Sequence, residues 1–149
     1  MGAPKFRLQS VLDYRRNLVD GARLQLAGLA MRCTTEEERL ERLRKSERDV
    51  VHEIHERQRS IVDVPEVMRL NEHLNVLAQR ISNQWSAVQR LRGEIERARG
   101  TLLGLTKDMK ALEKLQERQA EELAWAAMRL ERSETSEIAA RTHQALVAR

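Results

Sequence analysis

The sequence predicts an all-α protein, a long two-helix antiparallel coiled-coil hairpin with its turn near residues 62–66. Aromatic residues make up 3% of the 149-residue chain and charged residues 34%, which is typical of long helices rather than of a globular core. Apolar residues recur at alternating spacings of three and four along both halves, as coiled coils require. Pro65, the only proline after residue 4, separates the halves. These observations predict one domain, residues 1–149.

The first arm of the predicted hairpin covers about residues 5–62. Eleven of its fourteen seam positions are apolar when cysteine is counted, and the spacing never slips. A run of this length predicts a coiled coil rather than a short amphipathic helix. The positions are Leu8, Leu12, Arg15, Val19, Ala22, Leu26, Leu29, Cys33, Glu36, Leu40, Leu43, Glu47, Val50 and Ile54.

The stretch VDVPE, residues 62–66, predicts a stop followed by a new helix. Proline donates no backbone hydrogen bond and disfavours helical geometry in the residue before it. Asp63 suits the cap of the following helix, Pro65 an early helical position, and Glu66 the positive end of the helix dipole. The nearest partner for each seam is the other arm folded back. This favours the hairpin over a kinked rod that dimerises through both arms.

The second arm covers about residues 66–132, and its seam is equally regular. Sixteen of nineteen positions are apolar, an order that excludes disorder for this charged segment. They are Val67, Leu70, Leu74, Leu77, Ile81, Gln84, Val88, Leu91, Ile95, Ala98, Leu102, Leu105, Met109, Leu112, Gln116, Gln119, Leu123, Ala126 and Leu130. Residues 133–149 have no arm opposite, so the sequence leaves open whether they extend as a lone helix or fray.

A turn centred on residue 64 predicts which residues of the two arms face each other. Leu40 would face Val88 in the seam. Among the polar seam residues, Arg15 would lie near Glu113 and Glu36 near Arg92. Gly28 would lie near Gly100, where two backbones can approach closely. Polar pairs of this kind fix the register of a coiled coil at some cost in stability.

Charge and cysteine content restrict the classes of function. The formal charge is +4, and the signs are interspersed, which is typical of a solvated helix surface rather than a nucleic-acid tract. One cysteine allows no internal disulfide, and no signal peptide or membrane span is visible, so we expect a soluble cytosolic chain. We interpret Cys33 as a buried structural thiol.

The sequence offers no convincing catalytic, cofactor or metal site, so we predict that the protein is not an enzyme. His52 and His55 in the stretch HEIHE are three residues apart, whereas a zincin motif needs four, and we interpret both as solvated helix residues. A two-helix rod also has no enclosed pocket in which a carboxylate can be desolvated.

Three stretches resemble the FliJ family of flagellar type III export proteins, and more distantly its injectisome counterparts. They are KFRLQSVLDYRRNLVDGARLQLA at 5–27, MRLNEHLNVLAQRISNQW at 68–85 and KALEKLQERQAEE at 110–122. The resemblance implies an antiparallel coiled coil that binds the hexameric export ATPase, the cytoplasmic domain of the export gate FlhA, and empty export chaperones. It also implies a cytoplasmic protein associated peripherally with the inner face of the membrane at the flagellar base.

The resemblance also implies contact residues. The gate contact would fall on His73, Leu77, Arg80 and Gln84, although Leu77 and Gln84 are also seam positions. The ATPase contact would fall on the basic residues near the paired termini, namely Arg7, Arg16, Arg23, Lys110, Lys114 and Arg118. Two other classes of function stay open at this point. They are a generic coiled-coil scaffold or tether, and a basic helical nucleic-acid binder.

Overall fold

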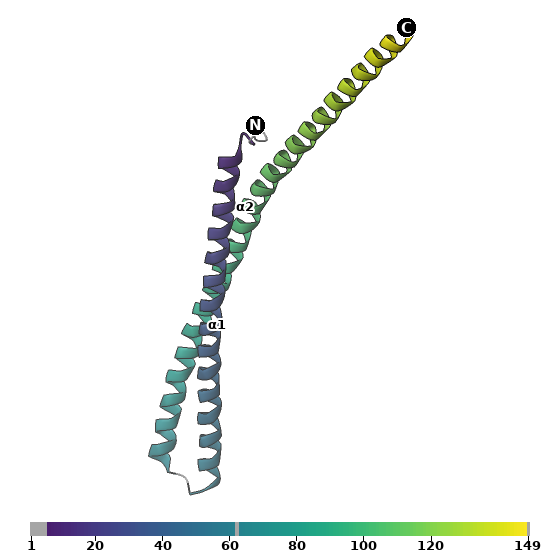
Figure 1. The fold of residues 1–149 in the computed structure, drawn as a ribbon. Helices are drawn as coiled ribbons and strands as arrows, with labels where there is room; N and C mark the ends of the chain where they lie inside the picture. Colours follow the sequence, from purple (N-terminus) through teal and green to yellow (C-terminus); the bar gives the residue numbers. More distant parts are fainter. Residues whose placement is uncertain (1–5, 62, 149) are drawn as a thin grey trace. The chain divides into compact units, whose positions relative to one another are not determined.

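The chain forms two long α-helices. A computed structural model describes residues 6–61 and 63–148 and contains α1 (Gln9–Arg59) and α2 (Val64–Val147) (Figure 1). Those residues include no β-strand, so the predicted all-α class is confirmed. Residues 1–5, 62 and 149 lie outside the described part, and so do the predicted start of the first arm at residue 5 and the first residue of the predicted turn.

The turn lies slightly earlier than the sequence predicted. Helix α1 ends at Arg59 and α2 already begins at Val64, so residues 64–66 of the expected turn are helical. Proline fits here because an N–H in the first helical turn would have no intrahelical acceptor. Asp63 caps α2 as predicted, since its Oδ1 accepts a hydrogen bond of 3.4 Å from the backbone N–H of Glu66.

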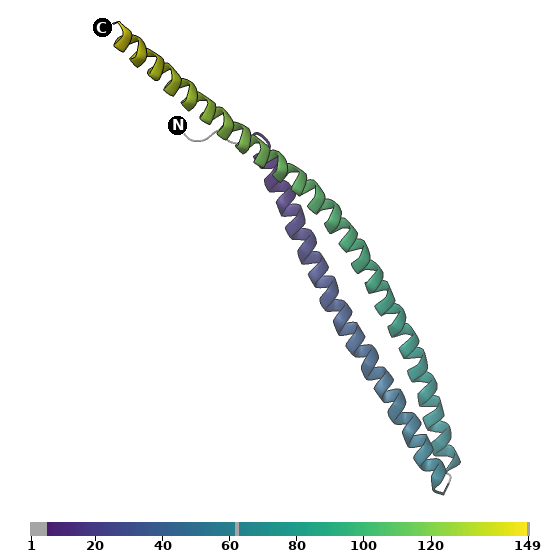
Figure 2. The ribbon, with the colours of Figure 1, turned by 90° about the vertical axis from the view of Figure 1, so that its right-hand side faces the viewer.

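The chain divides into two units. The first, which we call the turn unit, is Asp20–Leu103, and the second, the terminal unit, comprises Met1–Val19 and Gly104–Arg149. In the turn unit, α1 and α2 run antiparallel and side by side (Figures 1 and 2). Its core is built from two clusters. One contains Cys33, Leu40, Val88, Leu91 and Ile95, and the other contains Val50, Ile54, Leu70 and Leu77. Every one of these residues is a predicted seam position.

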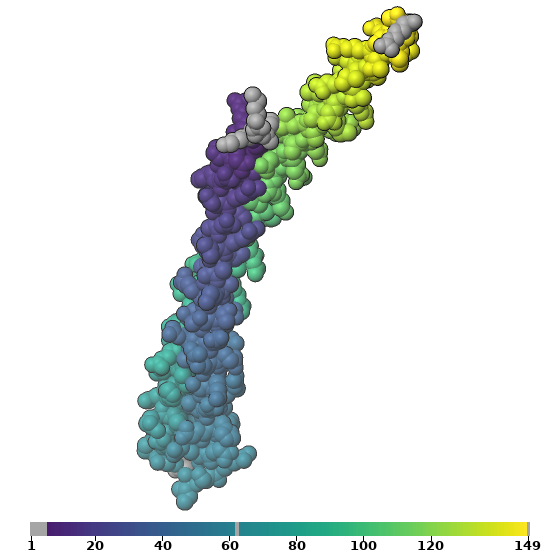
Figure 3. Space-filling view, in the orientation of Figure 1, coloured from purple at the N-terminus to yellow at the C-terminus, as the bar shows by residue number. Residues whose placement is uncertain are grey.

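The terminal unit is paired over only part of its length. Leu12 and Val19 of α1 are fully buried, and the Nε2 of Gln116 on α2 donates a 2.8 Å hydrogen bond to the Oε1 of Gln9. From residue 120 to residue 148 every residue is exposed (Figure 3). The helix nevertheless continues to Val147, so residues 133–147 extend as a helix rather than fray. The seam pattern runs to Leu130, but its burial stops near Gln119 because α1 begins at Gln9.

Neither predicted polar pair forms. Glu36 bonds to Gln84 rather than to Arg92, which instead pairs with the adjacent Glu37 at 3.1 Å. Arg15 pairs with Asp108 at 3.5 Å, and Glu113 pairs with the adjacent Arg16 at 3.6 Å. Arg92 and Glu113 thus pair with the direct sequence neighbours of the residues predicted to face them.

The predicted close approach of glycines is also wrong. A Cβ added to Gly28 or to Gly100 would meet no atom within 4 Å outside its own chain neighbours and its own helix turn. Both glycines are exposed on the surface of the turn unit. Neither is therefore required by packing between the two helices.

Candidate partner-binding surfaces

The residues predicted to contact the export gate divide into two groups. His73 and Arg80 are exposed on α2, whereas Leu77 is 3% exposed and belongs to a core cluster of the turn unit. Gln84 is half-buried at the seam. A side chain that fills the core has little surface left for a partner. The structure therefore presents only His73 and Arg80 of the predicted set to solvent. Val76, 47% exposed between them in sequence, is an apolar neighbour that the sequence analysis missed.

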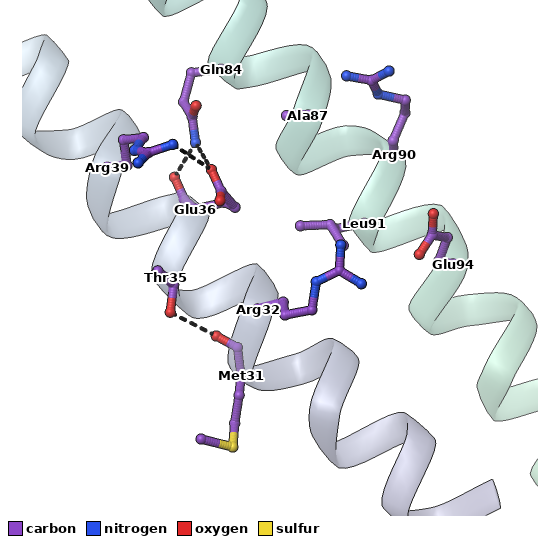
Figure 4. Close-up of a pocket in the computed structure, with 10 residues that line it drawn as sticks. All are labelled: Met31, Arg32, Thr35, Glu36, Arg39, Gln84, Ala87, Arg90, Leu91 and Glu94. Carbon is purple, nitrogen blue, oxygen red and sulfur yellow. Dashed lines mark hydrogen bonds and ion pairs between the residues drawn. The ribbon is translucent and has the colours of Figure 1, made fainter.

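Gln84 holds the two helices together through a polar bridge. Its Nε2 donates a 2.9 Å hydrogen bond to the backbone carbonyl of Glu36 and a second bond to that residue's carboxylate Oε2 (Figure 4). Arg39 lies 3.8 Å from the same carboxylate. The polar seam residues Glu36 and Gln84 thus satisfy each other. Bridges of this kind commonly specify register in coiled coils.

An open groove runs beside this bridge in the turn unit (Figure 4). Arg32, Arg39 and Arg90 line it together with Glu36 and Glu94, so charges of both signs face it. Most of its lining residues are exposed to solvent. The groove is therefore open to water.

Cys33 is buried in the seam and lies in a small polar cluster. Its Sγ donates a hydrogen bond of 3.3 Å to Oε1 of Glu37, which also accepts from Arg92. Burial raises the pKa of the Cys33 thiol, and the bond to Glu37 raises it further. A thiol is a poor nucleophile when its thiolate is disfavoured. The structure confirms that the Cys33 thiol is buried, as predicted.

Three of the predicted ATPase-contact residues form a single exposed face of α2 in the terminal unit. Lys110, Lys114 and Arg118 follow one another at spacings of four, which places them on one side of a helix. Lys107 continues the same side one turn earlier and was missed, although its spacing of three from Lys110 is visible in the sequence. All four side chains are exposed.

The remaining predicted ATPase-contact residues are placed differently. Arg16 lies 3.6 Å from Glu113 and 3.8 Å from Asp13, so its charge is partly neutralised within the terminal unit. Arg7 is exposed just before α1. Arg23 belongs to the turn unit, where it lies 3.7 Å from Asp20. Arg16 and Arg23 therefore already have acidic partners.

The described residues contain neither a cluster of metal-ligating side chains nor a membrane-spanning helix. Across 6–61 and 63–148, no group of three or more His, Cys, Asp or Glu side chains is arranged to hold a metal ion, and His52 and His55 are both exposed. Over the same residues, no helix contains a stretch that is both long and apolar enough to cross a bilayer.

Comparison with known proteins gives a family match, and its range includes the three stretches described from the sequence. The family model described as "Flagellar FliJ protein" matches residues 4–145, which is nearly the whole chain. No curated protein and no solved structure gives a significant match. A match over this length, on a chain built from two antiparallel helices, shows that the protein belongs to the FliJ family of flagellar export proteins.

Proposed function

We propose that this protein serves flagellar type III export as a coiled-coil adaptor that binds the hexameric export ATPase through the terminal unit and the gate protein FlhA through the turn unit. The family match over residues 4–145 carries the proposal, because FliJ proteins are components of flagellar export. We further propose that the protein binds empty export chaperones and is held at the inner face of the membrane through the gate.

The exposed cations of the terminal unit support an ATPase contact. Lys110, Lys114 and Arg118 point away from the seam and form no ion pair in the described part of the chain. Charges without intramolecular partners can pair with acidic groups of a ring without first breaking an existing ion pair. Arg16 is expected to contribute less, since it already has two carboxylates within 4 Å.

The apolar seam beyond residue 119 also supports this contact. Leu123 is 42% exposed and Leu130 65% exposed, although both occupy positions that are buried or half-buried earlier along α2. Exposed apolar side chains in a continuous stripe are typical of a surface that a partner covers. The central opening of a ring of subunits could supply such a cover for a slim helix.

The turn unit supports a separate gate contact. His73 and Arg80 lie on the flank of α2, with Val76 beside them, and all three are accessible. Leu77 and Gln84 contribute indirectly, by fixing the two helices against each other. We therefore assign the gate contact to His73, Val76 and Arg80.

Charge reversal tests the two contacts against each other. The variant Arg7→Glu, Arg16→Glu and Lys114→Glu should lose association with the purified ATPase ring and keep its binding to the cytoplasmic domain of the gate. A matched control reverses Arg42, Arg44 and Lys45, which are exposed cations of the turn unit. Equal loss of binding to the ATPase ring and to the gate domain, or no loss of binding to either, would contradict the assignment. A generic scaffold would leave ATPase association and activity unchanged in every variant.

A further inference from the structure

A basic face extends along α2 of the terminal unit, beyond the residues assigned above. It consists of Lys107, Lys110, Lys114, Arg118, Arg129 and Arg132, all exposed. At about 100° of rotation per residue, the six side chains fall within an arc of about 100° over a length of about 38 Å. The seam positions Met109, Leu112 and Gln116 lie on the opposite side of the helix. Pairing with α1 therefore leaves the basic face uncovered.

The six cations have no acidic partner within the described residues, since none of them takes part in an ion pair there. By contrast, Arg15 and Arg16 of the same unit both pair with carboxylates of α2. Glu121 lies inside the arc of the basic face, and Glu117 and Glu122 lie just beyond its two edges. The six cations thus outnumber these three glutamates, and they form two groups, at residues 107–118 and 129–132.

Two large apolar side chains lie in line with these cations. Trp125 is 60% exposed and Met128 is 47% exposed, and both fall within the same arc as the basic residues. Tryptophan beside lysine and arginine on a helix surface is a combination that favours the interface between lipid headgroups and acyl chains. A straight row of side chains on one helix can also touch a flat surface simultaneously.

We propose that this basic face binds an anionic lipid surface, with the cations at the headgroups and Trp125 inserted between them. This goes beyond the proposed function, because it requires neither the ATPase nor the gate. Each lysine or arginine near such a surface strengthens binding about fivefold, and salt weakens the attraction. Glu117, Glu121 and Glu122 limit the affinity of the natural sequence.

Vesicle binding by the full-length chain tests the proposal. Trp85→Phe in the turn unit leaves Trp125 as the single tryptophan reporter. The protein is mixed with vesicles of phosphatidylcholine, with or without phosphatidylglycerol, and followed by co-sedimentation and Trp125 emission. We expect binding and a blue shift with phosphatidylglycerol, neither with phosphatidylcholine alone, and loss of both at high salt.

Charge variants in the same background identify the surface. Lys107→Gln, Lys110→Gln and Lys114→Gln together should weaken binding about 100-fold. The control variant removes the same charge from the turn unit through Arg42→Gln, Arg44→Gln and Lys45→Gln. It should change vesicle binding by less than about threefold. Glu121→Gln with Glu122→Gln should strengthen binding. Circular dichroism checks that every variant keeps its helix content.

Several results would overturn the proposal. These are absence of binding to phosphatidylglycerol vesicles, equal binding to phosphatidylcholine, or equal weakening by the two triple variants. Retention of the protein on immobilised polyglutamate without vesicle binding would assign the face to an acidic protein instead. No ATPase is present in these assays, so their failure leaves the proposed function untouched. Failure of the ATPase experiment likewise leaves the lipid proposal standing.

Discussion

The variant Leu77→Ala tests which of two roles this side chain has. The family resemblance places Leu77 in the gate contact, whereas the structure places it in the core. The side chain is 3% exposed and packs in a core cluster with Val50, Ile54 and Leu70. Leucine-to-alanine substitutions in cores remove about 2–5 kcal/mol of stability. The seam of two helices is thin and its neighbours can relax into the gap, so we expect a loss near the lower limit, about 2–3 kcal/mol. This corresponds to an increase of about 30-fold or more in the unfolding equilibrium constant.

Urea unfolding followed by circular dichroism measures this loss. The matched control is Val76→Ala at the adjacent position, which is 47% exposed. It should change stability by no more than about 0.5 kcal/mol, because a surface substitution removes little packing and alanine favours the helix. A loss below about 0.5 kcal/mol for Leu77→Ala, or equal losses for both variants, would refute the assignment of Leu77 to the core.

Gate binding then provides the second half of the test. Under conditions where both proteins are fully folded, Leu77→Ala should bind the gate domain as the parent does. Substitution of His73 or Arg80 by alanine should weaken binding without changing the urea midpoint. If Leu77→Ala weakened gate binding while leaving stability intact, the division between core and contact residues proposed above would be wrong.

Three further predictions concern single residues of the turn unit. Gly100→Ala should raise the free energy of unfolding by about 0.5–1 kcal/mol in urea titrations, because the added methyl group meets open space, and destabilisation would indicate a contact that is absent here. Native Cys33 should react with a thiol reagent at least about tenfold more slowly than the urea-unfolded chain, because burial raises the pKa of its thiol, whereas equal rates would show an accessible thiolate. A hydrogen bond from Arg69 lowers the pKa of Glu66, so its stabilising contribution is present above the usual glutamate pKa and is lost as pH falls through the lowered value. Arg69→Gln should therefore reduce the acid-induced loss of stability measured by circular dichroism, and an unchanged pH profile would contradict this.

The helices and the seam were predictable because they follow from repeated, local features. Spacings of three and four place successive apolar residues on one side of a helix, and no other residue has to be known. The cap at Asp63 was predictable for the same reason, since it depends on residues within one helical turn. The core clusters of the turn unit therefore contain seam residues throughout.

The register of the polar pairs was not predictable from spacing alone. It depends on the length of the turn, and periodicity does not encode that length. Glu36 and Glu37 are adjacent, so a small shift decides which of them meets Arg92. The end of the paired region is another non-local property. The seam pattern continues through Leu130, but whether those residues are buried depends on where α1 begins.

A helix in a two-helix coiled coil buries only one narrow stripe, so the rest of its surface remains available to partners. Beyond residue 119, α2 of the terminal unit exposes both its apolar seam, with Leu123 and Leu130, and the basic face on the opposite side. The ATPase and lipid proposals therefore use different sides of the helix at residues 123–132. They use the same side at Lys110, Lys114 and Arg118. Both partners can therefore bind residues 123–132 at the same time. Only one of them can contact Lys110, Lys114 and Arg118 at that moment.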